Sequence, residues 1–487
     1  MLAEGVIVQH AEFGLGKVVR ILGDLVSVEF YGDMLDVRGD ELTPTPEAIR
    51  RVSANEPPPT GGVPFRRALE ALNLGVVPPD PGELIEFTIG GHETAQEVKG
   101  WLDRFPEAGL CKAVFGNYGT GKSHFLRLVE AIALQAGWVV SLLEFDPKAA
   151  DPAKPHLVYR GLANNLRFPP REDGSQISDF EGLIYEVRKH WDRVSSGLLF
   201  RNSPWFRPAL ETLRFYARNQ EEDYGSACSW LGGADVPLSV IRGLARAAKV
   251  PDAIPRLPRM RETADIYVHH LAVLAEICRN LGYGGLLLVL DEAEHVRGFN
   301  VRRQERANNL FDVLARSAHY PMKAGGSIIP NDHGVALGPY WNQGPHFALV
   351  VGLTEGDVFA DKSVPLHDAC VFLHNKSDRK MLKPPSPAEY EAWCEHFLRR
   401  FCEYRPTHAA MLDSDKARRA VAAALRVGFE KAPLESRVLR RWLKLACLVP
   451  SVLMAGNAAT LEELIAILDR AALELGDQLL PWDDLVG

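Results

Sequence analysis

Eight residues at positions 116–123, GNYGTGKS, constrain this chain more than any other segment, because they match the pattern GxxxxGK[ST] at every fixed position. Glycines in such a loop let successive backbone N–H groups curl around phosphate oxygens, and the N-terminus of the following helix adds partial positive charge. An apolar strand is predicted over residues 111–115 and a helix over residues 123–134, which is the context that this loop requires. The sequence therefore predicts a phosphate-binding loop in an α/β fold with a parallel sheet, rather than a chance glycine-rich turn.

Two side chains of the loop have tasks of their own. Lys122 is placed to reach the β- and γ-phosphates of ATP, and the hydroxyl of Ser123 is placed to bind a magnesium ion. ATP and Mg²⁺ are therefore the predicted cofactors. The predicted ATP-binding residues are Gly116, Asn117, Tyr118, Gly119, Thr120, Gly121, Lys122, Ser123 and His124.

A second motif follows the apolar run 286–290, which ends in Asp291-Glu292-Ala293-Glu294. Two carboxylates at the end of a buried strand are costly unless they meet a cation. We predict that Asp291, with Ser123, holds the magnesium ion and that Glu292 orients and polarises the attacking water. Glu294 and His295 are interpreted as surface or capping groups. The alternative for the whole motif is an ordinary strand before an acidic helix start, which the upstream loop disfavours.

Two further polar residues complete the predicted catalytic set, which is Glu292, Lys122, Thr354 and Arg437. Thr354 follows an apolar strand predicted over residues 347–353. It would face the γ-phosphate if that strand lies between the strands that end at the loop and at Asp291. Arg437 lies near the start of an amphipathic helix predicted over residues 436–447, from which it could reach the γ-phosphate. For each residue an equal alternative stands, a threonine in a turn or a solvated arginine.

Three arginines follow the second motif closely: Arg302, Arg303 and Arg306. They could reach a neighbouring subunit's nucleotide as an arginine finger, in a homo-oligomer. The competing interpretation is a solvated helix face, which such charge runs form more often.

The loop, Asp291-Glu292, Thr354 and Arg437 together resemble an AAA+ ATPase of the origin-recognition and loader branch. The resemblance implies that Thr354 is the residue called sensor 1 and that Arg437 is sensor 2. Residues 88–93, TIGGHE, are similar to the Gly-Arg-Glu segment that flanks the adenine in that branch, with Gly91-His92 where an arginine is usual.

A longer similarity runs through RRALEAL at 66–72, VVPPD at 76–80, the loop itself and KPHLVYR at 154–160. Over roughly residues 64–450 the chain resembles the ATP-binding proteins of BREX systems, in particular the BrxD type. BREX systems defend bacteria against phage, usually with a DNA methyltransferase, an alkaline-phosphatase-like protein and a helicase. The resemblance implies an antiviral role, with a helicase or methyltransferase as protein partner.

Several domains are expected, because 487 residues exceed one ordinary domain. We predict a small β-barrel at 1–44, a proline-rich linker at 45–63, an AAA+ P-loop core at 64–375 and a helical lid with a winged-helix-like part at 376–487. A largely helical insertion is predicted within the core at about 150–280. Further strands are predicted at 138–143 and 369–373, and a capping box at Ser386 and Glu389 predicts the start of a helix.

The predicted N-terminal barrel has strands at 5–8, 16–22 and 25–30, punctuated by glycines. Residues 5–18 are similar to the Tudor-like barrel of some repair helicases and to the barrel of transcription-coupled factors that bind RNA polymerase. Residues 1–44 carry eight acidic and three basic side chains. Negative charge opposes phosphate binding, so we expect this unit to dock a protein rather than DNA.

Charge and composition limit the remaining options. Residues 376–444 hold sixteen basic and nine acidic side chains, which allows contact with duplex DNA there, or forms ordinary solvated helix faces. No apolar stretch of about 18 residues exists, so no membrane span is predicted. The N-terminus does not resemble a signal peptide, and the seven cysteines are scattered, so a cytoplasmic location is expected.

The sequence leaves two functions open and disfavours a third. The first is an ATPase of phage defence that uses ATP binding and hydrolysis to switch a DNA-bound or partner-bound state. The second is a slowly hydrolysing, nucleotide-dependent scaffold that recruits a helicase or methyltransferase. A small-molecule kinase is disfavoured, because such an enzyme needs neither the long insertion nor the Asp-Glu pair.

Overall fold

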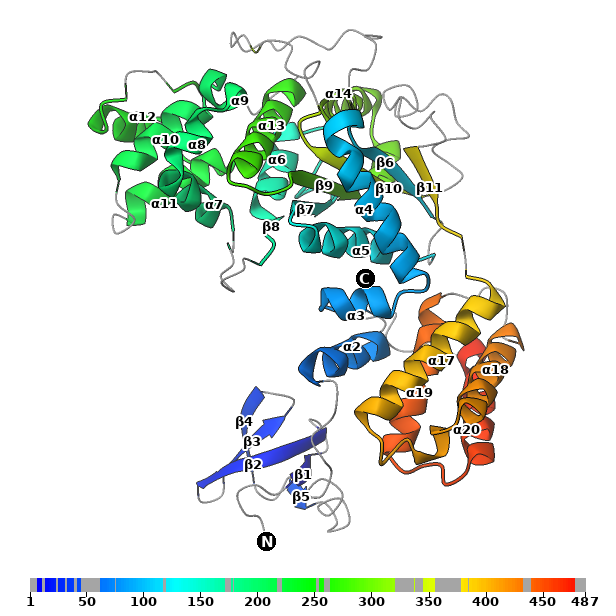
Figure 1. Ribbon diagram of the computed structural model, residues 1–487. Helices are drawn as coiled ribbons and strands as arrows, with labels where there is room; N and C mark the ends of the chain where they lie inside the picture. Colours follow the sequence, from blue (N-terminus) through cyan, green and yellow to red (C-terminus); the bar gives the residue numbers. More distant parts are fainter. Residues whose placement is uncertain are drawn as a thin grey trace.

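The structure is a computed structural model that describes residues 7–10, 14–22, 25–30, 33–38, 42–44, 62–74, 76–116, 120–170, 177, 179–216, 221–250, 254–257, 263–319, 337, 345–354, 378–383, 385–431 and 439–477. Two sheets and many helices make up this part of the chain (Figure 1). The predicted strand at 369–373 lies outside the described residues.

The central sheet has six strands in the order β11-β6-β10-β9-β7-β8. Its strands are β6 (Cys111–Phe115), β7 (Val139–Glu144), β8 (Leu166–Arg167), β9 (Leu286–Asp291), β10 (Ala348–Leu353) and β11 (Arg379–Met381). Every neighbouring pair is parallel except β7 with β8, which is antiparallel. The predicted parallel sheet is therefore confirmed, and β10 lies between β6 and β9.

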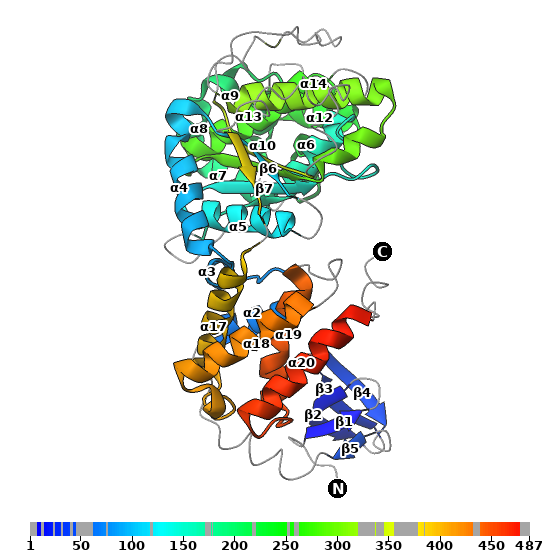
Figure 2. The ribbon, with the colours of Figure 1, turned by 90° about the vertical axis from the view of Figure 1, so that its right-hand side faces the viewer.

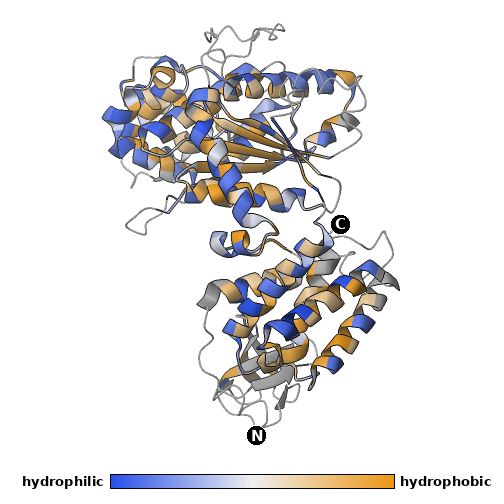
Figure 3. Cartoon of the chain, turned by 45° about the vertical axis from the view of Figure 1, so that its right-hand side comes forward, coloured by the Kyte–Doolittle hydropathy of each residue, from blue (hydrophilic) through white to orange (hydrophobic). Residues whose placement is uncertain are grey.

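Helices cover both faces of this sheet, because alternate residues of its buried strands point to opposite sides. In β9, Leu286, Leu288 and Leu290 belong to one hydrophobic cluster, whereas Leu287 and Val289 belong to another. The second cluster includes side chains of α4 (Gly91–Ala108) and α5 (Lys122–Gln135). Figure 3 shows the apolar strands enclosed between these helical layers.

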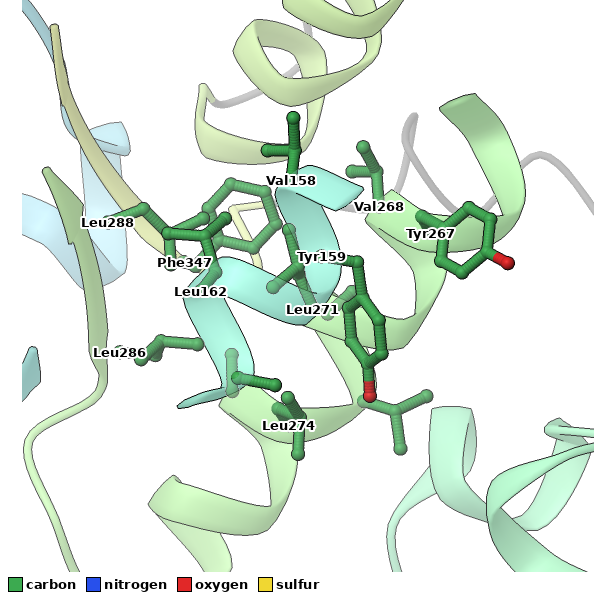
Figure 4. Close-up of a cluster of buried hydrophobic side chains, with 14 of the residues drawn as sticks. Val158, Tyr159, Leu162, Tyr267, Val268, Leu271, Leu274, Leu286, Leu288 and Phe347 are labelled. Carbon is green, nitrogen blue, oxygen red and sulfur yellow. The ribbon is translucent and has the colours of Figure 1, made fainter. Parts of the chain in front are cut away.

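The first cluster joins the sheet to α6 (Pro155–Asn164), α13 (Ala264–Asn280) and α14 (Val301–Ala318). Leu162 of α6 and Leu271 of α13 face Leu288 of β9 in this cluster (Figure 4). The cluster continues into the helices between β8 and α13, which are α7 (Phe180–Lys189), α8 (Trp191–Ser195), α9 (Leu198–Asn202), α10 (Phe206–Phe215), α11 (Glu221–Leu231) and α12 (Leu238–Ala247).

A separate hydrophobic cluster holds together a bundle of helices, one that precedes the central sheet in the chain and four that follow it. Its helices are α2 (Gly62–Leu74), α17 (Pro387–Tyr404), α18 (Asp415–Lys431), α19 (Leu439–Met454) and α20 (Leu461–Asp477). Phe65 of α2 packs between Phe87 and Tyr404, with ring centroids 5.7 and 5.0 Å away. From the sequence we expected residues 64–74 in the ATPase core, whereas the buried residues of α2 belong to the same hydrophobic cluster as those of α17 to α20. Figure 2 shows α2 beside the helices of this bundle.

The start of α17 confirms the predicted capping box. The Ser386 hydroxyl accepts from the Glu389 N–H at 3.3 Å, and the Glu389 carboxylate accepts from the Ser386 N–H at 2.7 Å. No strand follows β11 within residues 378–383, 385–431 and 439–477, so the β-hairpin that a winged helix requires is not seen there. None of the described helices is apolar over a length that could cross a membrane.

The N-terminal sheet is antiparallel, with strand order β4-β3-β2-β1-β5. Its strands are β1 (Ile7–His10), β2 (Gly14–Leu22), β3 (Leu25–Phe30), β4 (Asp33–Arg38) and β5 (Leu42–Pro44). Pairing among these described strands ends at β4 and β5, so they form an open sheet rather than the closed barrel that was expected. The strands β4 and β5 were not expected from the sequence.

Candidate functional site

The candidate site lies at the carboxyl ends of three neighbouring strands. The strand β6 ends at Phe115, just before Gly116; β9 ends at Asp291; and β10 ends at Leu353, just before Thr354. Because parallel strands end at one edge, the polar groups that follow them meet there. Because β10 pairs in parallel with both β6 and β9, Thr354 lies between the loop and Asp291. This is the strand order under which we expected Thr354 to face the γ-phosphate.

Lys122 is the centre of this constellation. Its ammonium lies 2.8 Å from Glu294 Oε1, 3.4 Å from Asp291 Oδ1 and 3.5 Å from Glu292 Oε1. Only 8% of its side chain is exposed. Burial by itself would lower the pKa of Lys122, but the hydrogen bond that the ammonium donates to Glu294 and the three nearby negative charges outweigh burial and raise the pKa. Lys122 is therefore a firmly charged group at the start of α5.

Asp291 and Ser123 form the second part of the site. The Ser123 hydroxyl donates to Asp291 Oδ2 at 2.7 Å, and the N–H of Glu292 donates to Asp291 Oδ1 at 2.8 Å. The carboxylate is buried. A hydroxyl and a carboxylate oxygen, held side by side, are the ligands that Mg²⁺ prefers, so these two residues fit the ion that was predicted for them.

Glu292 stands at a sharp change of chain direction. Its φ of 58° lies in the left-handed region, which non-glycine residues seldom adopt and which often marks a functional position. Burial, followed by the negative charge of Glu294, raises the pKa of Glu292. Its carboxylate keeps 30% exposure and lies 3.7 Å from His295 Nε2. A partly exposed carboxylate with a raised pKa is suited to accept a proton from water.

Glu294 is not the surface or capping group that we expected from the sequence, because its side chain points into the site. Its side chain is 17% exposed, and its Oε1 accepts hydrogen bonds from Lys122 and from the Thr354 hydroxyl. Burial opposes its ionisation, but these two donors lower the pKa of Glu294 below its usual value. The left-handed turn at Glu292 starts a 3₁₀ helix, Ala293–Gly298, that brings Glu294 back to the site. By contrast, His295 is exposed, as expected.

Glycines make room at three places around these groups. Gly121 has a φ of 87°, which a side chain would strain. A Cβ on Gly116 would lie 2.4 Å from the Thr120 hydroxyl, and one on Gly352 would lie 2.7 Å from Asp291 Oδ1. The backbone at Gly116 and Gly121, two described residues of the loop, therefore does not accommodate a side chain, and these two residues with Lys122 fit a bound nucleotide phosphate.

The remaining predicted residues divide into two groups. Asn117, Tyr118, Gly119 and Arg437 lie outside the described residues, as does Glu355 after Thr354. His124 is described: its Nε2 lies 2.7 Å from the Thr88 hydroxyl, and desolvation lowers the pKa of His124 to about 4. The predicted adenine-flanking segment thus contacts the first turn of α5.

Of the arginines considered as fingers, Arg303 is engaged within the chain. Its Nη2 lies 3.0 Å from Oδ2 of the fully buried Asp151, and its guanidinium lies 3.8 Å from the Phe299 ring centroid. Arg302 is exposed and Arg306 is partly buried. Arg303 therefore joins the start of α14 to the segment that follows β7.

Comparison with known proteins decides the family. A family model described as BREX system ATP-binding protein BrxC/D matches residues 65–198 and 200–319, more than half of the chain. The chain belongs to this family. No curated protein matches it. Membership gives this BREX protein an ATP-binding role in phage defence, while the BrxD type remains a prediction, because the family description joins both types.

The matched residues of this BREX ATP-binding protein include the loop at 116–123 and the motif at 291–294. Thr354 and the C-terminal helices lie beyond the match. The loop and Asp291-Glu292 were recognisable from local sequence pattern. Glu294 had no such signal, because its place depends on the turn at Glu292.

Proposed function

We propose that this chain is a magnesium-dependent ATP hydrolase of the AAA+ type. The observation that carries the proposal is the convergence of Lys122, Ser123, Asp291, Glu292 and Thr354 at one edge of the sheet. The strand order, with β10 between β6 and β9, supports the AAA+ assignment because it brings Thr354 to the loop.

Each residue has a role in the proposed reaction. Lys122 binds the β- and γ-phosphates, and the loop N–H groups orient them. Ser123 and Asp291 hold Mg²⁺, which supplies charge neutralisation at the phosphates when bound. Glu292 orients the attacking water and takes its proton, a task that its raised pKa suits. Thr354 contacts the γ-phosphate with its hydroxyl.

We propose further that the C-terminal bundle is the lid of this site. The bundle is tied to the core through α3 (Pro81–Glu86): the Trp393 indole donates to the Phe87 carbonyl at 2.8 Å, and Arg400 pairs with Glu86 at 2.7 Å. ATP binding would close the lid and hydrolysis would reopen it, which switches a bound partner. Arg437 would reach the γ-phosphate from the lid.

The second candidate is a nucleotide-dependent scaffold that hydrolyses ATP slowly in the cytoplasm and recruits a helicase or methyltransferase. Ion pairs made by arginines of the C-terminal bundle favour this scaffold over direct contact with duplex DNA. Four arginines of the basic segment are paired in this way: Arg400 with Glu83 and Glu86, Arg418 with Asp415, Arg419 with Glu395, and Arg426 with Glu391 and Glu430. Paired arginines are less available to neutralise DNA phosphates.

Steady-state ATP turnover, with and without duplex DNA, tests the proposal on wild type and Glu292→Gln. The expected result is turnover that falls at least about 100-fold in the variant while ATP binding is retained. Glu144→Gln serves as the matched control, because Glu144 is an exposed carboxylate opposite Asp291 in the sheet register. Stimulation by DNA would favour the switch over the scaffold. Equal turnover in wild type and Glu292→Gln would refute hydrolysis at this site.

A further inference from the structure

One oxygen atom of Glu294 joins two side chains that the proposed function assigns to the γ-phosphate. Its Oε1 accepts from the Lys122 ammonium at 2.8 Å and also from the Thr354 hydroxyl. Lys122 and Thr354 are themselves 3.4 Å apart, from Nζ to Oγ1. A γ-phosphate oxygen held by both groups would need the same position.

We propose that Glu294 is an internal competitor of the γ-phosphate and thereby sets the discrimination between ATP and ADP. The inference rests on the proposed function in one respect only, the assignment of Lys122 and Thr354 to the γ-phosphate. ADP lacks that group, so Glu294 keeps its two hydrogen bonds when ADP binds. ATP must displace Glu294 to reach Lys122 and Thr354.

The surroundings of Glu294 show that the carboxylate is held mainly by these two donors. Its second oxygen, Oε2, is buried and has no hydrogen-bond partner among the described residues. A buried carboxylate oxygen without a donor is costly, so the rest of the site does not stabilise this position. An entering phosphate therefore has to replace the contacts to Lys122 and Thr354, the two side chains that donate to Glu294 Oε1.

Glu292 does not share this arrangement, although it is also near Lys122. Its Oε1 lies 3.5 Å from the ammonium, beyond normal hydrogen-bond distance for a charged pair, and its Oε2 lies 3.7 Å from His295 Nε2. Glu144, at the same edge of the sheet, is exposed. Among these three carboxylates, Glu294 alone accepts from both Lys122 and Thr354. Its proposed effect on ATP binding therefore comes from this position and not from negative charge alone.

The test is isothermal titration of the full chain with ADP and with a non-hydrolysable ATP analogue, both with Mg²⁺. Glu294→Gln weakens the contact to Lys122, and Glu294→Ala removes it. Both variants are expected to bind the ATP analogue about 10- to 100-fold more tightly, the size of one charge-assisted hydrogen bond, while ADP affinity changes less than about threefold. Glu144→Gln, the matched control, is expected to leave the ratio of the two affinities unchanged.

Glu294→Asp separates geometry from charge. It keeps the negative charge but withdraws the carboxylate by one methylene, so it should also favour the ATP analogue over ADP. A wild-type ratio in Glu294→Asp would mean that charge alone acts, which overturns the proposal. Equal tightening of both nucleotides in the other variants, or weaker binding of the ATP analogue, overturns it as well.

This outcome is separable from the proposed hydrolysis, because the readout is binding. A wild type that binds ATP without turnover removes the hydrolase proposal and leaves the ratio test intact. Thermal melting of each variant confirms that it folds. If both Glu294→Gln and Glu294→Ala fail to fold while Glu294→Asp folds, the ratio measured for Glu294→Asp alone decides.

Discussion

The hydroxyl of Thr88 lies 2.7 Å from Nε2 of His124 and joins the segment before α4 to the first turn of α5. The same hydroxyl donates to the Leu84 carbonyl at 2.6 Å, so its hydrogen is already engaged. His124 must therefore be the donor, through a protonated Nε2. Because desolvation lowers the pKa of His124 to about 4, the ring is the neutral tautomer with hydrogen on Nε2 at physiological pH.

This contact joins α5 to the segment that follows α3, and Figure 2 shows α3 between α5 and the C-terminal bundle. Leu84 belongs to α3, and Phe87, the residue before Thr88, accepts a hydrogen bond from Trp393 of α17. We predict that Thr88→Val weakens the transmission of ATP binding to α17. Hydrogen–deuterium exchange should show that ATP slows exchange in α17 of wild type, and that this slowing is smaller in the variant.

Thr94→Val is the control for that experiment. Thr94 lies on α4 near the same segment and is partly buried, and it should behave as wild type. Loss of the Thr88 hydroxyl removes its hydrogen bonds to the Leu84 carbonyl and to His124, about 1 kcal/mol each, so ATP affinity should change by about 30-fold at most. Undiminished protection of α17 in Thr88→Val would show that the signal, if it exists, takes another route.

The pair formed by Ser123 and Asp291 leads to a prediction about magnesium. Asp291→Asn keeps the size of the side chain but removes its charge, so the variant should lose most of the gain in ATP affinity that Mg²⁺ gives. ATP titrations in Mg²⁺ and in EDTA measure that gain directly. Affinity in EDTA should stay within a few fold of wild type.

Asp146→Asn provides the matched control for Asp291→Asn. Asp146 is an exposed carboxylate just beyond β7 whose Oδ1 accepts from the N–H groups of Lys148 and Ala149. Its variant should retain the full magnesium effect. An unchanged magnesium effect in Asp291→Asn would rule out Asp291 as a ligand of the ion.

Position 352 of strand β10 has no room for a side chain next to the site. A Cβ there would lie 2.7 Å from Asp291 Oδ1 and 2.7 Å from Leu126 Cδ1. Gly352→Ala should therefore displace Asp291 and lower stability by about 1–3 kcal/mol, as overpacking of a core does. The melting temperature and the magnesium effect on ATP affinity should fall together.

Gly100→Ala is the corresponding control, because nothing lies within 4 Å of a Cβ at that position in α4. Alanine favours a helix over glycine by about 0.5–1 kcal/mol, so this variant should melt at or above the wild-type temperature. A Gly352→Ala protein that melts like wild type and retains the magnesium effect would show that Asp291 and Leu126 can adjust.

Local pattern was enough to predict the buried strands, because apolar runs as short as 111–115 and 286–290 with glycine nearby are typical of strands buried in a sheet. It was not enough for β11. Its three residues, Arg379, Lys380 and Met381, have no apolar pattern, and they form a strand because they pair with β6. The same holds for α2, whose amphipathic sequence does not say which core it joins.

The candidate site shows the same division between local and distant information. The glycine pattern identifies the loop, and an apolar run followed by two acidic residues identifies Asp291 and Glu292. Both motifs consist of residues that are adjacent in the sequence. The place of Thr354 depends on strand order, and that of Glu294 on the left-handed turn at Glu292. Neither strand order nor a strained φ has a signature in a single sequence.

Arg303 is expected to act within its own chain rather than on a neighbour. Asp151 is fully buried, and its Oδ1 accepts from the Ala153 N–H while its Oδ2 pairs with Arg303. Arg303→Ala leaves Asp151 Oδ2, among the described residues, with only the more distant Lys154 ammonium, at 3.5 Å, so stability should fall by about 1–3 kcal/mol. Arg302→Ala, at the exposed neighbouring position, should melt like wild type.

Mixing experiments then separate this structural role from an arginine finger. In an oligomer with fingers in trans, Arg303→Ala has an intact loop and Lys122→Ala has an intact Arg303, so their mixture would regain ATP turnover at shared interfaces. With Arg303 bound to Asp151 in its own chain, the mixture should show only the sum of the separate rates. Restored turnover would contradict the structural role, because a guanidinium committed to a buried carboxylate cannot also bind a neighbour's γ-phosphate.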